Sequence, residues 1–142
     1  MKARVSLIVI HYHTPFLLEK LLFSFFEHTD LESHSFEILI INNGGEIPRT
    51  VQHGMPISPR ILSPTSNIGY AGAVNLGVEE STGDMMMIMN SDLLFLKDSV
   101  KILLSSLVKN DIVGPFFFWE ESCRIMLPPT EPVGLLYQVL RY

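Results

Sequence analysis

The amino-acid sequence predicts an α/β fold with a mostly parallel sheet flanked by helices. Short aliphatic runs alternate with longer segments in which apolar residues recur at helical spacing. The aliphatic runs are apolar at successive positions, which is typical of strands buried on both faces of a parallel sheet. Turns with asparagine and glycine follow several of these runs, so the strands have defined ends.

Length and composition indicate one globular domain over residues 1–142. The chain is 47% hydrophobic and 18% charged, and its net charge of −5 argues against broad nucleic-acid binding. Its longest apolar runs, 7–10 and 85–89, are too short to span a membrane. A single Cys123 excludes an internal disulfide and is typical of a reducing cytosol. We therefore expect a cytoplasmic protein without a transmembrane segment, and peripheral contact with the inner face of the membrane stays open.

The first half of the chain predicts three strands and one clear helix. Residues 5–10 and 36–41 are the two central strands, and residues 60–62 form a short third strand after a weak helix or loop. Thr14 is the expected N-cap of the helix, with Pro15 at its first position and an end near His28. The apolar face of this helix consists of Leu18, Leu21, Leu22, Phe25 and Phe26.

The second half predicts two further helices and more strands. Residues 70–80 form a helix with Ala71, Val74 and Val78 on its apolar face, and residues 85–89 form a strand whose methionines fill the core. Asp98 caps the next helix, whose apolar stripe is Val100, Leu103, Leu104, Leu107 and Val108. Later elements are a fifth strand over 112–119, interrupted at Gly114-Pro115, a short strand over 124–127 and a helix over 135–142.

Polar residues follow the strands at places that a doubly wound sheet brings together. If the first strand lies between the second and fourth, the turns at 11–14, 42–45 and 90–92 meet in one crevice. The glycine-bearing segment 67–77 opens a helix, and a helix N-terminus suits a phosphate. Asp92 ends a strand, where a carboxylate suits a hard cation. These features together predict a nucleoside diphosphate bound through a divalent metal.

Four motifs in order resemble glycosyltransferase family 2, which has the GT-A, Rossmann-like fold. The resemblance covers most of residues 4–119 and includes the first strand with Tyr12-His13 and the turn at 42–45. Its third motif matches the rhamnosyltransferase-like branch, and its fourth is a glycine-acid pair, an apolar strand and Asn90-Ser91-Asp92. The residues that fit the third motif in register are Asn67, Gly69, Tyr70, Ala71, Asn75 and Gly77.

The resemblance implies inverting transfer of a sugar from a UDP- or dTDP-sugar to an acceptor such as a cell-surface polysaccharide. It implies Mg²⁺ or Mn²⁺ as cofactor, bound by Asp92. The nucleotide-sugar site that it implies comprises Tyr12, Thr14, Asn42, Asn67, Gly69, Asn75 and Asn90.

The sequence also departs from the family pattern. His13 and Asn42 replace the usual Asn and Asp, and the segment 90–92 offers one carboxylate instead of two. The chain ends before the acceptor-binding half of the family, so no general base is identified and a truncated enzyme is expected. A non-catalytic nucleotide-sugar-binding or interaction module is the alternative. Because the chain ends early, the apolar segments 116–119 and 135–140 would lack cover, and either self-association through them or poor solubility is expected.

Simpler roles for these residues stay open at this point. Asp92 and Asn42 also suit plain turns, and Asn67 and Asn75 also suit loop bracing. Gly69 and Gly72 also suit backbone geometry or helix packing. His11 and His13 share a face of a strand, as a metal pair would, but nothing nearby completes a tetrahedral set. A dinucleotide-binding domain is disfavoured because no Gly-x-Gly-x-x-Gly follows the first strand.

Overall fold

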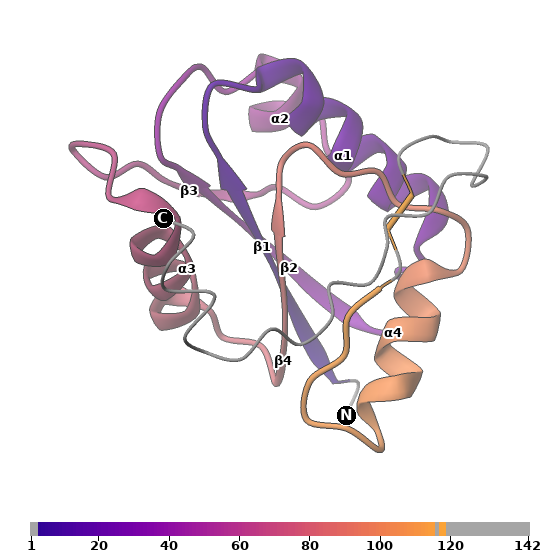
Figure 1. Ribbon diagram of the computed structural model, residues 1–142. Helices are drawn as coiled ribbons and strands as arrows, with labels where there is room; N and C mark the ends of the chain where they lie inside the picture. Colours follow the sequence, from indigo (N-terminus) through magenta and orange to yellow (C-terminus); the bar gives the residue numbers. More distant parts are fainter. Residues whose placement is uncertain (1–2, 116, 119–142) are drawn as a thin grey trace. The chain divides into compact units, whose positions relative to one another are not determined.

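A computed structural model describes residues 3–115 and 117–118 of the chain. Strands and helices alternate along it (Figure 1). The first compact unit, Met1–Ile102, contains the whole sheet and the helices α1, α2 and α3. The elements are β1 (Arg4–His11), α1 (Pro15–His28), β2 (Ser35–Asn42), α2 (Arg49–His53), β3 (Arg60–Leu62), α3 (Gly69–Glu80), β4 (Met85–Asn90) and α4 (Ser99–Leu107).

The sheet has the order β3-β2-β1-β4, and every pairing in it is parallel. Leu7 of β1 lies opposite Ile38 of β2 on one side and Met87 of β4 on the other. The prediction of a parallel α/β sheet with the first strand between the second and fourth is confirmed. The carboxyl ends of β1, β2 and β4 therefore lie side by side at one edge.

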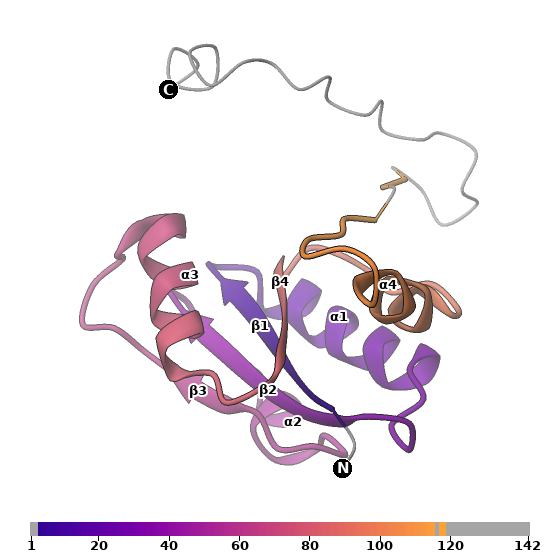
Figure 2. The same cartoon turned by 90° about the horizontal axis from the view of Figure 1, so that it is seen from below.

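Helices α1 and α3 cover opposite faces of this sheet, as Figures 1 and 2 show. On the α1 side, the fully buried Phe25 meets Phe36 of β2 edge to face, with ring centroids 5.3 Å apart. On the α3 side, Ile8, Ile10, Ile41 and Ala73 form a buried cluster. The predicted apolar face of α1 is confirmed for Leu18, Leu21, Leu22 and Phe25, which are buried, whereas Phe26 is only partly buried.

The predicted apolar face of α3 is partly wrong. Ala71 and Val78 are exposed, whereas the buried residues of this helix are Ala73 and Gly77, and Val74 is partly buried against the cluster. A Cβ atom on Gly77 would lie 2.4 Å from Cγ2 of Ile8, so the helix backbone sits directly against β1. The prediction relied on the larger apolar side chains of the helix. The face that packs on the sheet instead carries its smallest residues, Ala73 and Gly77, because they allow the closest approach of the helix to the sheet.

The prediction that the methionines of β4 are core residues is also partly wrong. Burial alternates along β4, and Met86 and Ile88 are 46% and 41% exposed. They lie on the same sheet face as Ile8, but α3 packs over β1 and β2 rather than over β4. One face of this edge strand is therefore uncovered among the described residues.

The expected fifth strand does not form over the described part of 112–119. Residues 112–115 and 117 have no regular secondary structure, and Phe118 makes an isolated bridge. Gly114-Pro115 explains this, because proline cannot donate to a strand ladder. The strand expected over 124–127 and the helix expected over 135–142 lie outside the described residues. No helix in the described ranges is long and apolar enough to cross a membrane.

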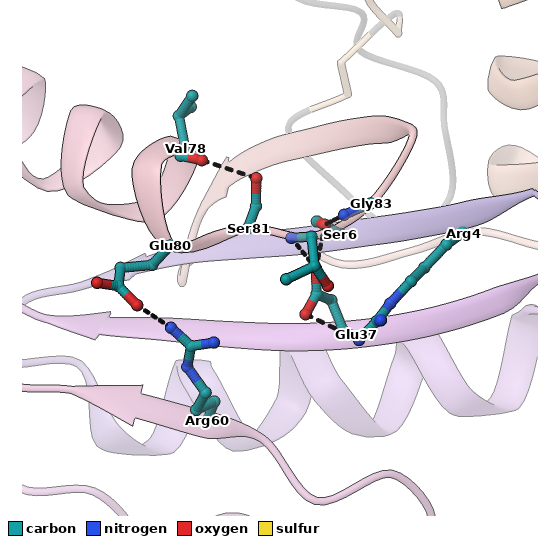
Figure 3. Close-up of polar contacts among 9 residues, drawn as sticks. Arg4, Ser6, Glu37, Arg60, Val78, Glu80, Ser81 and Gly83 are labelled. Atoms are coloured by element: carbon teal, nitrogen blue, oxygen red, sulfur yellow. Dashed lines mark hydrogen bonds and ion pairs between the residues drawn. The ribbon is translucent and has the colours of Figure 1, made fainter.

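The partly buried carboxylate of Glu37 joins three segments at the amino ends of the strands (Figure 3). Oε1 of Glu37 accepts hydrogen bonds from the Ser6 hydroxyl and from the backbone N–H and hydroxyl of Thr82. The backbone N–H of Gly83 donates to Oγ of Ser6 at 2.9 Å, and Arg4 pairs with Oε2 of Glu37 at 3.2 Å. Burial alone would raise the pKa of Glu37, but the bonds from Ser6 and Thr82, with Arg4, lower it below its ordinary value.

We expect Gly77→Ala to lower the free energy of unfolding by about 1–3 kcal/mol, because the added methyl group overpacks against Ile8. Gly72→Ala in the same helix is the matched control. Its Cβ atom would meet only Ile68, at 3.3 Å, and that side chain is 41% exposed and free to move. The control should leave the free energy of unfolding unchanged or raise it by up to ~1 kcal/mol, because alanine has a higher helix propensity than glycine. Urea unfolding of both variants tests this, and a Gly77→Ala protein more stable than the wild type contradicts the packing described.

We expect Glu37→Gln to cost about 1–2 kcal/mol of stability near neutral pH. The folded pKa of Glu37 is below the unfolded value, so its stabilisation is complete above the unfolded pKa and is lost as pH falls through the folded pKa. Denaturant unfolding from about pH 7 to about pH 3 measures this, and the acid slope should be shallower in the variant. Identical slopes in the two proteins would show that Glu37 does not contribute.

Candidate functional site

A cleft of about 300 Å³ lies at the carboxyl ends of the strands. It is formed by the tips of β1, β2 and β4 and the start of α3. Its lining residues are Ile10, Tyr12, Thr14, Asn43, Asn67, Gly69, Tyr70, Asn90, Ser91 and Asp92. Six of the eight residues expected in a nucleotide-sugar and metal site are therefore brought together, and the exceptions are Asn42 and Asn75.

The loop after β1 and the turn after β2 are fitted closely to each other. The backbone N–H of His13 donates to the carbonyl of Gly44 at 2.9 Å. Gly45 has a φ of +102°, and a Cβ atom there would lie 2.9 Å from Cα of His13. His13 itself has a φ of +52°, a conformation that is strained for a residue with a side chain. The two segments therefore hold Tyr12 in place at the edge of the cleft.

Asn42 and Asn43 have different roles in this turn. The amide of Asn42 closes the turn, since it donates to the Gly45 carbonyl and accepts from the Gly44 N–H, both at 3.2 Å. Asn43 is 7% exposed, lines the cleft, and accepts a hydrogen bond from the backbone N–H of Ile68 at 2.8 Å. No role for Asn43 was predicted from the sequence. The pair of adjacent asparagines was the available signal, because one amide is enough to close the turn and the other can then bond elsewhere.

The loop before α3 is shaped by Asn67 and Gly69. Oδ1 of Asn67 accepts from the Gly69 N–H at 2.8 Å, and Gly69 has a φ of +74°. A Cβ atom on Gly69 would meet nothing within 4 Å, so its backbone conformation is what favours glycine there. Asn75 lies exposed further along α3 and does not line the cleft.

His11 is fully buried beneath the cleft. Its Nε2 lies 3.1 Å from the carbonyl oxygen of Glu46, and its Nδ1 lies 3.4 Å from Oγ1 of Thr14. Burial lowers the pKa of His11, His13 lowers it further, and the Glu46 carbonyl opposes them. Thr14 is the N-cap residue of α1, as predicted, and its carbonyl accepts from the Leu18 N–H at 3.0 Å, but its side chain makes no capping bond. Its hydroxyl lies instead 2.7 Å from that of Ser91.

Asp92 is exposed two residues beyond the end of β4. Among the described residues its carboxylate has no hydrogen-bond or ion-pair partner. Asn90 pairs with Ile10 in the sheet, and the backbone N–H of Ser91 donates to the Ile10 carbonyl at 3.2 Å, which fixes the chain just before Asp92. No group of three or more His, Cys, Asp or Glu side chains gathers to hold a metal in the described ranges. A cation at Asp92 would therefore need further ligands of another kind, such as amide or hydroxyl oxygens, water or a bound phosphate.

Known proteins share both the sequence pattern and the fold. YwdF, an uncharacterized glycosyltransferase of Bacillus subtilis (strain 168), is 27% identical over 111 residues, which are 78% of this chain and 40% of the relative. The mannosyltransferase PcManGT from Pyrobaculum calidifontis, solved with GDP-Man and Mn²⁺, has a TM-score of 0.67 at 21% identity over 79% of this chain. Residues 1–349 of S. aureus TarS give a TM-score of 0.62 at 18% identity over 76% of this chain.

The chain spans 40% of the length of the curated relative and 34% and 33% of the lengths of these two structures. The structural likeness confirms the expected GT-A-type fold. The family model for glycosyl transferase family 2 matches residues 6–131, which is most of the sequence. On this match, the chain belongs to glycosyl transferase family 2.

Proposed function

We propose that this chain carries the donor site of an inverting glycosyltransferase, which binds a nucleoside diphosphate sugar through a divalent cation at Asp92. One observation carries the proposal: a carboxylate without a partner among the described residues stands in a cleft built from three parallel strand tips and a helix start. Ligands of doubly wound sheets bind at such a place.

The side chains present fit a hard cation that arrives with phosphates. Mg²⁺ and Mn²⁺ prefer oxygen ligands, and Mg²⁺ is usually held by one or two carboxylates together with substrate phosphates and water. Asp92 would supply the carboxylate, and Asn90, whose amide carries an oxygen, lines the same cleft. A cation bound there would offset the negative charge that grows on the departing diphosphate.

Two aromatic side chains and a helix start suit the remaining parts of such a donor. Tyr12 and Tyr70 line the cleft and are 53% and 54% exposed, so their rings are free to stack on a base or to cover a sugar. Helix α3 begins at Gly69, whose N–H is bound by Asn67, and the positive end of the helix favours an anion near the cleft. We therefore assign Tyr12, Tyr70 and Gly69 to donor binding, together with Thr14, Asn67 and Asn90, which line the same cleft.

The reaction that we propose is a single displacement at the anomeric carbon. An acceptor hydroxyl oxygen forms the new bond from the side opposite the diphosphate. The bond between the anomeric carbon and the phosphate oxygen breaks, and the diphosphate leaves with the electron pair. The acceptor proton passes to a general base, for which we assign no residue in the described ranges. A hexose or deoxyhexose such as rhamnose is the proposed sugar, and a cell-surface polysaccharide is the proposed acceptor.

The alternative is a non-catalytic nucleotide-sugar-binding module. Both proposals require the nucleotide to bind at the same cleft, so binding alone does not separate them. Release of free sugar or transfer to any acceptor from a bound donor supports the enzyme. Tight donor binding without release or transfer supports the binding module.

Calorimetric titration of UDP, dTDP and GDP, each with and without Mn²⁺, tests the donor site. We expect at least one nucleotide to bind, and Mn²⁺ to strengthen its binding about tenfold or more, because a charge-assisted contact contributes about 1.5–3 kcal/mol. In Asp92→Ala the effect of Mn²⁺ should disappear.

The matched control is Glu79→Ala, which removes an exposed carboxylate from α3 outside the cleft. It changes the net charge as Asp92→Ala does, so it should bind as the wild type does. Equal Mn²⁺-dependent binding by wild type and Asp92→Ala would remove Asp92 from the metal role. No binding of any of the three nucleotides would refute the donor site.

A further inference from the structure

We propose that His11 is a positioning residue of this donor site, and that it sets the direction of the Thr14 and Ser91 hydroxyl groups beside Asp92. The role rests on the proposed function of the cleft. The sequence does not predict this role, because it offers His11 only as half of a metal pair.

Four segments are joined through the buried His11 ring. Nε2 contacts the Glu46 carbonyl in the loop after β2 at 3.1 Å. Nδ1 contacts the Thr14 hydroxyl in the loop after β1 at 3.4 Å, and that hydroxyl contacts Ser91, after β4, at 2.7 Å. We call His11, Thr14 and Ser91 the hydrogen-bond chain. It connects the tip of β1 to the residue before Asp92.

The direction of each proton in the hydrogen-bond chain follows from the Glu46 contact. A carbonyl oxygen only accepts, so Nε2 of His11 carries a proton. The ring is neutral near neutral pH because burial lowers its pKa, and Nδ1 is then bare. The Thr14 hydroxyl donates to Nδ1, and the Ser91 hydroxyl therefore donates to Thr14. Ser91 keeps only lone pairs for any further partner.

This arrangement suits a site where a cation, not a bare anion, lies beside Asp92. Ser91 is 4% exposed and lines the cleft, and in this arrangement its hydroxyl has no proton left to donate into it. Without the bare nitrogen of His11, the Thr14 proton loses its acceptor and both hydroxyls are free to rotate. Binding would then require these groups to be ordered again, which weakens affinity.

The first test needs no ligand. Nitrogen-15 NMR of the wild-type His11 ring should show the neutral tautomer with its proton on Nε2. Hydrogen exchange at the Ser91 amide should be about fivefold faster in His11→Phe and in Thr14→Val, because each substitution removes one hydrogen bond of the chain. A charged ring near neutral pH, a proton on Nδ1, or unchanged exchange in both variants overturns the proposal.

The second test measures the affinity for UDP, dTDP and GDP with Mn²⁺. His11→Phe should weaken binding about fivefold to tenfold, the effect of losing roughly one hydrogen bond. His11→Gln should restore most of it, because its amide offers both a donor and an acceptor. In a Thr14→Val background, His11→Phe should cause no further loss, since His11 acts through Thr14. Additive losses, or equal binding by His11→Phe and wild type, overturn the proposal.

Ser6→Ala is the control for general destabilisation. Ser6 is buried and hydrogen-bonded like His11, but it lies at the opposite ends of the strands, so the variant should lose stability and keep its affinity. If the wild type binds none of the three nucleotides, the proposed function fails, and the NMR and exchange measurements still decide the role of His11. If the wild type binds and the His11 variants bind equally well, this inference alone fails.

Discussion

The parallel pairing of β1 with β2 on one side and β4 on the other is the constraint on which the site depends. This pairing requires the central strand to be buried on both faces, and β1 meets the requirement with seven consecutive buried residues. Because all three strands point the same way, His11, Asn42 and Asn90 end at one edge of the sheet. The cleft is thus a consequence of strand order rather than of any single motif.

Loop contacts then convert this shared edge into a defined cleft. The β2 turn supports the loop after β1 through Gly44 and Gly45, and Asn43 supports the loop before α3. The hydrogen-bond chain adds a link from β1 to the residue before Asp92. At the opposite ends of the same three strands, hydrogen bonds centred on Glu37 join β1, β2 and the segment before β4. Rigidity at both edges leaves the Asp92 carboxylate exposed on a fixed backbone.

Much of this could be predicted from the sequence, for identifiable physical reasons. Uninterrupted aliphatic runs identified β1 and β2, and the polar residues after them identified the edge with the cleft. Gly77 was assigned to a motif and not to the buried face of α3, because hydrophobicity scales do not register close backbone approach. Asn42 and Asn43 were indistinguishable, since either amide suits a turn. The contact between Thr14 and Ser91 in the hydrogen-bond chain joins residues 77 positions apart, which no local pattern reveals.

Paramagnetic relaxation measured with Mn²⁺ and UDP tests most directly whether the three strand tips converge on one cation site. Mn²⁺ should broaden the backbone amide signals of Tyr12, Asn67 and Ser91, which line the cleft. The amide signals of Ser6, Glu37 and Thr82, at the opposite ends of the strands, should stay sharp. Broadening centred on the amino ends, or spread evenly over the sheet, would contradict a cation site at Asp92.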